Sequence, residues 1–343
     1  MIGVGVIGYG YWGPNLVRNF YETPGAQVIA VSDLRPDRLK LVKDRYPTVN
    51  VTNSHQALIE DPKVEAVVIA TPVATHFELA LAALQAGKHV LVEKPLASSA
   101  QQVLRLIDAA EKARRTIMVE HTFVYTSAVR KIRELVDDGT VGDLYYFDST
   151  RVNLGLFQYD VNVLWDLAVH DLSILEYVAS QKPVAVSATG LAHVPGRSEN
   201  VAFLTLFFDG PLIAHVHVNW LSPLKVRRTL VGGSKKMIVY DDMEQSEKIK
   251  VYDKGITLKE SANRENVYDV MVGYRMGDMW APNLDVTEAL KVEAAHFVKC
   301  LANGEKPITD AEAGLRVVEI LEAASESLRR RGEPIALRTI GGR

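Results

Sequence analysis

The chain has 343 residues, which at roughly 150 residues per domain predicts two domains. Its 39 Lys and Arg side chains nearly balance 42 Asp and Glu, so the composition gives no sign of nucleic-acid or anionic-membrane binding. The single cysteine, Cys300, excludes an intrachain disulfide, and the absence of a membrane-length apolar run or a signal peptide predicts a cytoplasmic protein.

The first 120 residues alternate short apolar runs with helical patterns. The runs that predict strands are 2–7, 28–31, 49–51, 66–70, 89–92 and 116–119. Continuous apolar strands separated by helices are typical of a parallel sheet that is covered on both faces. The pattern therefore predicts an α/β fold, with a doubly wound Rossmann sheet and a dinucleotide-binding domain over residues 1–122.

A glycine fingerprint follows the first of these strands and opens a helix. Residues 8–13 read Gly-Tyr-Gly-Tyr-Trp-Gly. Gly8 allows a tight turn, Gly10 lets the backbone approach a pyrophosphate, and Gly13 lets helix and strand pack closely. The N–H groups at the helix N-terminus would then face the pyrophosphate, which predicts a dinucleotide site.

An acidic residue at the end of the second strand indicates which dinucleotide binds. Asp33 lies 20 residues beyond Gly13 and can accept hydrogen bonds from the adenosine ribose. Because its carboxylate would repel a 2′-phosphate, NAD is expected in preference to NADP. Arg35 and Arg38 lie nearby and weaken that preference.

From residue 123 the pattern changes to β-type runs that follow one another with turn signals between them. These runs are 144–152, 184–188, 201–208, 213–220, 228–231, 237–240 and 249–252. A helix is predicted before them at 128–136, and two more close the chain at 286–301 and 311–330. Residues 123–343 are therefore predicted to form an α+β domain with a largely antiparallel sheet.

A helix predicted over 163–179 carries a candidate acid–base pair. Asp166 and His170 are four residues apart and so are neighbours on an α-helix. An aspartate beside a histidine can orient the ring and raise its basicity, as general-base catalysis requires. A solvated polar face is the alternative reading of this helix. Asp171 falls on the apolar face and is expected to need a buried partner.

Two histidines on a predicted strand could suggest a metal. His215 and His217 share one strand face, but no carboxylate or cysteine lies beside them in the sequence. Strands of an open sheet often carry polar residues on one face. No metal site is therefore predicted.

Two further stretches resemble a known family. Residues 86–95, Ala-Gly-Lys-His-Val-Leu-Val-Glu-Lys-Pro, resemble the signature of the glucose–fructose oxidoreductase, inositol dehydrogenase and MocA superfamily. Residues 70–76, Ala-Thr-Pro-Val-Ala-Thr-His, and the Asp166-x-x-x-His170 spacing resemble it too. The resemblance implies hydride transfer to or from a sugar carbon, in a cleft between a Rossmann domain and an open-faced sheet domain. It also implies that this second domain, residues 123–343, serves substrate binding and oligomerisation.

The resemblance also implies roles for individual residues. Lys94 matches the family lysine, Asp166 its aspartate and His170 its acid–base residue, and the peptide bond before Pro95 is expected to be cis. The expected cofactor contacts are Gly8, Gly10, Tyr11, Trp12, Gly13, Asp33, Thr71, Pro72, His76, Glu93 and Lys94.

The chemistry of alcohol oxidation agrees with these roles. Lys94 follows a buried strand at its carboxyl end, where parallel α/β sheets place ligands. His170 would take the hydroxyl proton, Lys94 would stabilise the developing alkoxide, and Asp166 would orient one or both.

The substrate is predicted from a departure from the family pattern. Many members have a glycine-rich loop before the Asp helix, whereas residues 160–165 here read Asp-Val-Asn-Val-Leu-Trp. Together with a similarity to nucleotide-sugar 3-dehydrogenases that includes residues 8–20 and 277–282, this favours oxidation at C3 of a UDP-linked, N-acetylated hexose. The expected substrate contacts are Lys94, Arg151, Asn153, Asn162 and His170, with Arg151 and Arg275 supplying positive charge and Tyr159, Trp165 and Tyr274 supplying stacking surfaces.

Two alternatives remain at this stage. A dehydrogenase of free inositol or of a monosaccharide would use the same three catalytic residues. A non-catalytic, cofactor-binding regulator is a second alternative, against which the intact Lys94, Asp166 and His170 argue. For each of these three functions, the superfamily resemblance implies a homodimer or homotetramer.

Overall fold

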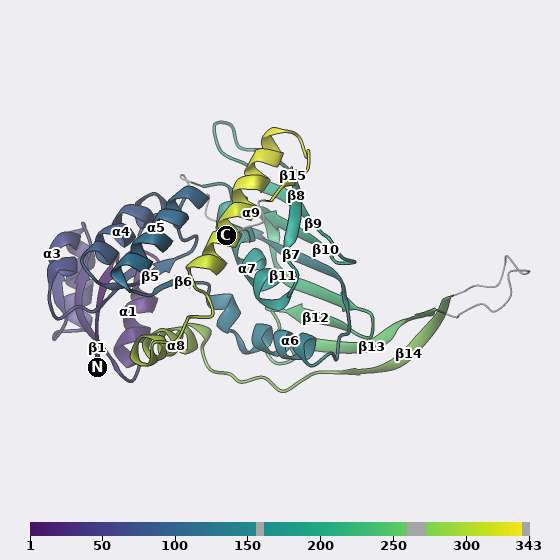
Figure 1. Cartoon of the computed structure of the whole chain (residues 1–343), viewed down its shortest axis with the longest axis horizontal. Coiled ribbons are helices and arrows are strands. Elements are labelled where there is room, and N and C mark those ends of the chain that lie inside the picture. The colour runs from purple at the N-terminus through teal and green to yellow at the C-terminus, as the bar shows by residue number, and fades with distance from the viewer. Residues whose placement is uncertain (156–160, 259–271, 338–343) are drawn as a thin grey trace, which may run out of the picture.

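The computed structural model describes residues 1–155, 161–258 and 272–337. Two β-sheets lie at opposite ends of the molecule, and helices cover the first sheet and fill the space between the two (Figure 1). We propose residues 1–122 and 123–343 as the domains built on these sheets.

The first sheet is parallel and contains every strand predicted for the first 120 residues. Its six strands lie in the order β3-β2-β1-β4-β5-β6. They are β1 (Ile2–Ile7), β2 (Ala26–Ser32), β3 (Asn50–Thr52), β4 (Ala66–Ile69), β5 (His89–Glu93) and β6 (Ile117–Glu120). Both faces are buried, which explains why the strands read as continuous apolar runs. The predicted doubly wound Rossmann sheet is confirmed.

The helices of this domain alternate with its strands. They are α1 (Gly13–Glu22), α2 (Pro36–Arg45), α3 (His55–Glu60), α4 (His76–Gln85) and α5 (Ala100–Ala113). Pro14 and Pro36 occupy first-turn positions, where the missing N–H costs no helical hydrogen bond. Ser54 and Ser99 cap α3 and α5 through hydrogen bonds to Ala57 N and Gln102 N.

The second sheet is mixed but largely antiparallel, as predicted. Among the described residues it has nine strands, in the order β14-β13-β12-β11-β7-β10-β9-β8-β15, and only β7 and β10 are parallel. The strands are β7 (Leu144–Leu154), β8 (Pro183–Leu191), β9 (Val201–Phe208), β10 (Ile213–Asn219), β11 (Leu221–Gly233), β12 (Met237–Asp241), β13 (Ile249–Leu258), β14 (Val272–Trp280) and β15 (Ile335–Ala336). Strands β14 and β15 were not predicted from the sequence.

One face of this sheet is covered by helices and the other is open. On β9 and β10 buried residues alternate with more exposed ones, so that Leu204, Leu206, Ala214 and Val216 join the core. The covering helices are α6 (Ser127–Asp137), α7 (Val169–Val178) and α9 (Ala311–Arg329). The π-helix Leu164–Ala168 leads directly into α7.

The last two helices connect the two sheets. Helix α8 (Ala289–Asn303) packs against α1, where the rings of Phe297 and Phe20 meet edge-on at 6.2 Å. Helix α9 contacts α5 of the first domain as well as α7 of the second. Helices α8 and α9 therefore cover the junction between the two sheets and hold the sheets in position relative to each other.

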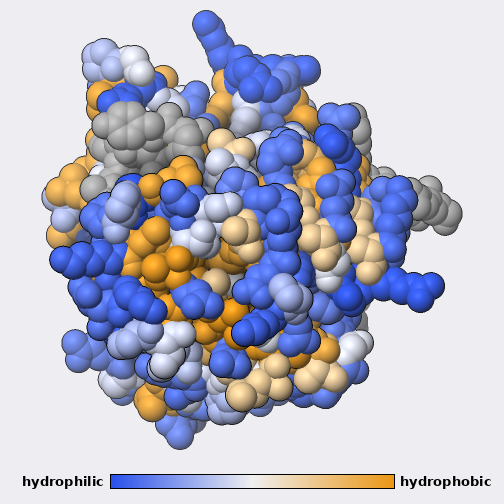
Figure 2. Space-filling view, turned by 90° about the vertical axis from the view of Figure 1, so that its left-hand side faces the viewer, coloured by the Kyte–Doolittle hydropathy of each residue, from blue (hydrophilic) through white to orange (hydrophobic). Residues whose placement is uncertain are grey.

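The surface at the first-domain end of the molecule is mixed in character. Figure 2 views this end and shows hydrophilic residues around a central group of hydrophobic ones. Such mixing is ordinary for a folded protein, because polar atoms alone do not cover a globular surface. Within the described part of the chain, no helix is both long and apolar enough to cross a membrane.

Candidate active site

The glycine loop at the end of β1 has the shape that a pyrophosphate needs. Gly8 has a φ of +97°, and a Cβ there would lie 2.4 Å from the oxygen of Ala70. A Cβ on Gly13 would lie 2.2 Å from the oxygen of Gly8, so helix and strand meet too closely for a side chain. At Gly10 the nearest atom would be Arg35 Nη2 at 3.7 Å, so this position borders open space. Within the described ranges no side chain caps α1, and its first-turn N–H groups fit an anion.

Asp33 stands at the end of β2, beside the same loop. Its carboxylate accepts hydrogen bonds from Tyr9 N at 2.8 Å and from Arg35 N at 2.9 Å. The Arg35 guanidinium contacts it as well, through Nε at 3.2 Å. Burial raises the pKa of Asp33, but these hydrogen bonds outweigh burial and hold the pKa below its usual value. The group is therefore an anion at neutral pH, as ribose recognition requires.

Lys94 lies at the end of β5 and joins the two domains. Its Nζ donates to the backbone oxygen of Asp166 at 2.9 Å and lies 3.4 Å from Asp166 Oδ1. The other carboxylate oxygen of Asp166 accepts a hydrogen bond from Trp220 Nε1 at 3.0 Å. The Lys94–Pro95 peptide bond is cis, as the family resemblance implies. The two contacts with Asp166 hold the ammonium group in the space between the sheets, and only 13% of the Lys94 side chain is exposed.

His170 lies near Lys94, but it is not hydrogen-bonded to Asp166. Residues 164–168 form a π-helix, whose wider turn alters the neighbour relation expected for an α-helix. The carboxylate of Asp166 is used by Lys94 and Trp220, and His170 Nδ1 is buried without a hydrogen-bond partner among the described residues. Of the two predicted roles for Asp166, the geometry supports the orientation of Lys94.

The surroundings of His170 favour its neutral form. Burial lowers its pKa well below the usual value, and the charges of Lys94, Arg151 and Arg227 lower it further. The ring of Phe123 meets the imidazole edge-on, with 5.0 Å between centroids. A neutral imidazole can accept a proton, so this environment suits a general base.

Behind Lys94 lies a group of buried acids that was not predicted from the sequence. Glu120, at the end of β6, accepts hydrogen bonds from Trp12 Nε1 at 3.0 Å and from the Thr122 hydroxyl. The Thr122 hydroxyl also lies 3.0 Å from Glu293 Oε2, on α8. Burial raises the pKa of Glu120 and Glu293, and repulsion from Glu120 raises that of Glu293 further.

Glu93 and His121 border this acidic group. The pKa of Glu93 lies well above its usual value, because of burial first and of the neighbouring Glu120 second. Both ring nitrogens of His121 are buried and have no hydrogen-bond partner in the described ranges. Burial and then the charge of Lys94 lower the pKa of His121 to about 3.

Two loops of the predicted cofactor site are tied together by His76. Its Nε2 lies 2.8 Å from the oxygen of Thr71, and its Nδ1 lies 2.8 Å from the oxygen of Pro95. The ring is 1% exposed, so His76 positions these loops and is not placed to contact a cofactor directly. Pro72 is exposed beside it, and Tyr11 is exposed on the glycine loop.

Arg151 is placed differently from the prediction. Its Nε and Nη2 donate to Asp171 at 2.7 and 3.1 Å, and both residues are buried. Asp171 also accepts a hydrogen bond from the Ser149 hydroxyl at 2.7 Å. The expected buried partner of Asp171 is therefore Arg151. A direct contact between this arginine and a substrate is not supported, since the ion pair occupies most of its guanidinium.

The two asparagines predicted to contact substrate have different positions and hydrogen-bond partners. Asn162 Oδ1 accepts a hydrogen bond from Leu164 N at 3.1 Å, and its Nδ2 donates to Glu199 at 3.0 Å. Asn162 therefore caps the helical segment, and this is a correction to its predicted role. Asn153 is half-buried on the same side of β7 as Arg151 and remains a candidate for substrate contact.

Of the residues expected to hold a diphosphate and a base, Arg275 and Tyr274 do not reach this site. Arg275 and the exposed Tyr274 lie on β14, which extends away from the body of the molecule (Figure 1). Four strand-to-strand steps separate β14 from β7, or roughly 19 Å at the usual spacing. Trp165 is half-buried and donates to Ser325 Oγ at 2.9 Å. Tyr159 lies outside the described residues.

Comparisons with known proteins agree with this geometry. Residues 2–121 match the family described as "Oxidoreductase family, NAD-binding Rossmann fold", and residues 129–239 match the GFO/IDH/MocA C-terminal domain. A myo-inositol 2-dehydrogenase of Thermotoga maritima is 26% identical over 95% of this chain and 96% of its own length. Inositol 2-dehydrogenase 2 of Saccharopolyspora erythraea is 31% identical over 67% of this chain and 70% of its own.

A solved structure is similar over nearly the whole fold. The UDP-N-acetylglucosamine 3-dehydrogenase of Acidithiobacillus ferrooxidans superposes with a TM-score of 0.78, over 96% of this chain and 100% of its own. Its sequence identity to this chain is 24%, so the likeness concerns the fold alone.

Proposed function

Because this chain belongs to the GFO/IDH/MocA family of NAD-binding oxidoreductases, we propose that it oxidises a secondary alcohol on a sugar or cyclitol ring. The observation that carries the proposal is the meeting of Lys94, Asp166 and His170 between the two sheets. The inositol dehydrogenases among the relatives support a polyhydroxylated ring as the substrate.

In this proposal each side chain has a separate task. Neutral His170 takes the proton of the substrate hydroxyl. The ammonium group of Lys94 donates a hydrogen bond to the same oxygen and stabilises the negative charge that develops there. Asp166 holds that ammonium group in place through its backbone and carboxylate oxygens. Gly8, Gly10 and Gly13, together with Asp33, would hold NAD, which would supply the hydride acceptor for the ring carbon.

For the substrate and the position of oxidation, we propose a UDP-linked, N-acetylated hexose that is oxidised at C3. Support comes from the bulky segment before the π-helix, where Asn162 caps the turn and Leu164 is fully buried, in place of a glycine-rich loop. The fold likeness to a UDP-N-acetylglucosamine 3-dehydrogenase is compatible with this substrate. The inositol dehydrogenase relatives favour the rival, a free cyclitol.

Calorimetry on the NAD complex separates the two substrates. We expect UDP-N-acetylglucosamine to bind with a dissociation constant on the order of micromolar, which is about −8 kcal/mol, and free glucose and inositol to bind much more weakly. UDP alone serves as the control for binding through the nucleotide. If inositol binds and no UDP compound does, the nucleotide-sugar assignment is wrong and the cyclitol takes its place.

A second prediction concerns the cofactor. Asp33 is anionic and faces the glycine loop, so NADH should bind at least about tenfold more tightly than NADPH, because a 2′-phosphate would be repelled. Fluorescence titration of both cofactors measures this ratio. Equal affinity would mean that Arg35, whose side chain is 52% exposed, leaves Asp33 to bind the phosphate.

We also propose that the open face of the second sheet joins two copies of this chain. Phe207, Ile213 and Tyr146 lie opposite one another on β9, β10 and β7, and all three are exposed on that face. Neighbouring exposed apolar residues are typical of an interface. Light scattering after gel filtration should give at least a dimer, and Phe207→Lys should dissociate it. A wild-type monomer would contradict this proposal.

A further inference from the structure

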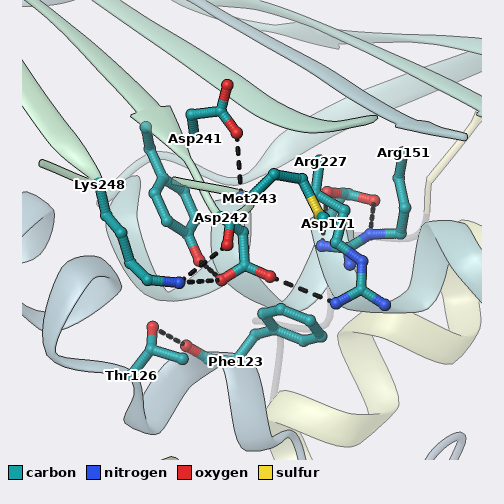
Figure 3. Close-up of polar contacts among 10 residues, drawn as sticks. Phe123, Thr126, Arg151, Asp171, Arg227, Asp241, Asp242, Met243 and Lys248 are labelled. Carbon is teal, nitrogen blue, oxygen red and sulfur yellow. Dashed lines mark hydrogen bonds and ion pairs between the residues drawn. The ribbon is translucent and has the colours of Figure 1, made fainter. Parts of the chain in front are cut away.

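Two arginines face each other beside the proposed base. In the register of β7 and β11, Arg151 and Arg227 are directly opposite. Their guanidinium groups lie over the same ring, that of Phe123, at 4.3 and 5.5 Å from its centroid (Figure 3). The ring of Phe123 in turn meets His170 edge-on at 5.0 Å. Like charges at directly opposite positions destabilise a sheet, so the pair needs compensation.

The neighbouring carboxylates compensate this charge incompletely. Asp171 forms two hydrogen bonds with Arg151. Arg227 has to share Asp242, because Lys248 Nζ lies 3.1 Å from this carboxylate and Arg227 Nη1 lies 3.2 Å from it (Figure 3). Among the residues that the structure describes, three cations thus meet two carboxylates in this cluster, and one positive charge is in excess.

The excess charge is accessible from the space around the site. Arg227 keeps 33% of its side chain exposed, whereas Arg151 is almost fully buried. Arg151 Nη1 is buried and, among the described residues, has no hydrogen-bond partner. A buried N–H donor without an acceptor costs free energy, so this pair of arginines offers both charge and unused donors.

We propose that Arg227, backed by Arg151, binds an anionic oxygen group carried by the substrate. The inference rests on the proposed function, in which His170 takes the proton of the substrate hydroxyl. The ring of Phe123 contacts both arginines and His170, so the two arginines lie close to that hydroxyl. The planar fork of a guanidinium suits a carboxylate or a phosphate. The anion is either the carboxylate of a sugar acid or the phosphate of a phosphorylated or nucleotide-linked sugar.

The test compares matched ligands with matched variants. Glucose, glucuronate, glucose 1-phosphate, UDP-glucose and UDP-glucuronate are titrated by calorimetry into the NAD complexes of the wild type, Arg227→Met and Arg228→Met. Arg228 is the control, because it is the next residue of β11 and is exposed on the opposite face of the strand. Far-UV circular dichroism and NADH titration verify that each variant is folded.

We expect the wild type to bind at least one anionic ligand about 30-fold or more tightly than its neutral counterpart. Arg227→Met should remove most of that advantage, Arg227→Lys should restore part of it, and Arg228→Met should leave it unchanged. A loss confined to the uronates assigns the carboxylate, and a loss shared by the phosphate compounds assigns the phosphate.

The proposal is overturned if the wild type shows no preference for an anion, or if Arg227→Met and Arg228→Met have equal effects. Turnover is measured separately, by NADH formation. The protein could bind anionic ligands more tightly, lose this preference in Arg227→Met, and yet oxidise none of these sugars. That result would support the anion site and reject the proposed function.

Discussion

Replacing Lys94 with methionine is expected to leave NAD binding intact while turnover falls by at least about 100-fold. Methionine keeps most of the volume of the lysine stem but removes the ammonium group that contacts Asp166. The substrate oxygen would then develop negative charge in a largely buried space without a cation beside it. Such charge stabilisation acts mainly in the transition state, so the loss should fall on kcat.

His170→Ala is expected to lower turnover by about 10² to 10⁴-fold for a different reason, the loss of the proton acceptor. Because burial and the neighbouring cations hold the pKa of His170 well below its usual value, the wild type should keep its activity at pH values below about 6.5, where an ordinary histidine would be protonated.

NADH formation followed spectrophotometrically, together with NADH fluorescence titration, checks both variants. Lys112→Met is the control, since Lys112 is exposed and pairs only with Asp108 among the described residues. If both site variants turned over near the wild-type rate, the reaction would not take place in this part of the molecule. A wild type that binds NADH but oxidises no sugar or cyclitol would instead favour the non-catalytic regulator.

Asp171→Leu should destabilise the fold by about 3–5 kcal/mol, the largest stability effect that we expect for a single substitution. The side chains of Arg151 and Asp171 are 5% and 1% exposed, and they share two hydrogen bonds. Removing the carboxylate leaves the arginine charge buried between the sheet and α7. It also deprives the Ser149 hydroxyl of an acceptor.

The double variant Arg151→Met/Asp171→Leu separates charge from packing. With both charges removed, the free energy of unfolding should recover by more than half of what Asp171→Leu loses, because apolar side chains often replace a buried ion pair at little cost. Urea denaturation of the wild type, the single variant and the double variant measures the three free energies. A double variant as unstable as Asp171→Leu would show that the shape of the aspartate, and not its charge, stabilises this region.

The elements that the sequence predicted well are those whose signal is local. Strands β4 and β6 of the first sheet are short, fully buried runs, and burial on both faces makes such runs visible without any knowledge of their neighbours. Strand β14 lacks this signal, because its residues 274–280 are mostly exposed and backbone pairing with β13 holds it in place. The same reason explains why β11 extends from 221 to 233 when only 228–231 was predicted.

The sequence by itself also predicted which residues form the proposed site. The glycine loop, Asp33, Lys94, Asp166 and His170 were found from spacing and from family resemblance, and the structure brings the last three together between the sheets. What local spacing could not predict is how these groups are paired. Asp166 binds Lys94, 72 residues away, and it lies in a π-helix rather than in the α-helix that the sequence predicted.

Only the tertiary structure decided which polar residues pair with other residues inside the fold and which remain available to a ligand. Arg151 was expected to meet the substrate, yet Asp171 takes up its charge, while Arg227, which no motif distinguished, faces the proposed base. The face on which Arg227 lies depends on the register of β11 against β7, because a slip of one residue would move Arg227 to the opposite face and bring Arg228 in its place. Register is set by contacts between distant strands, and the residues around a single arginine do not encode it.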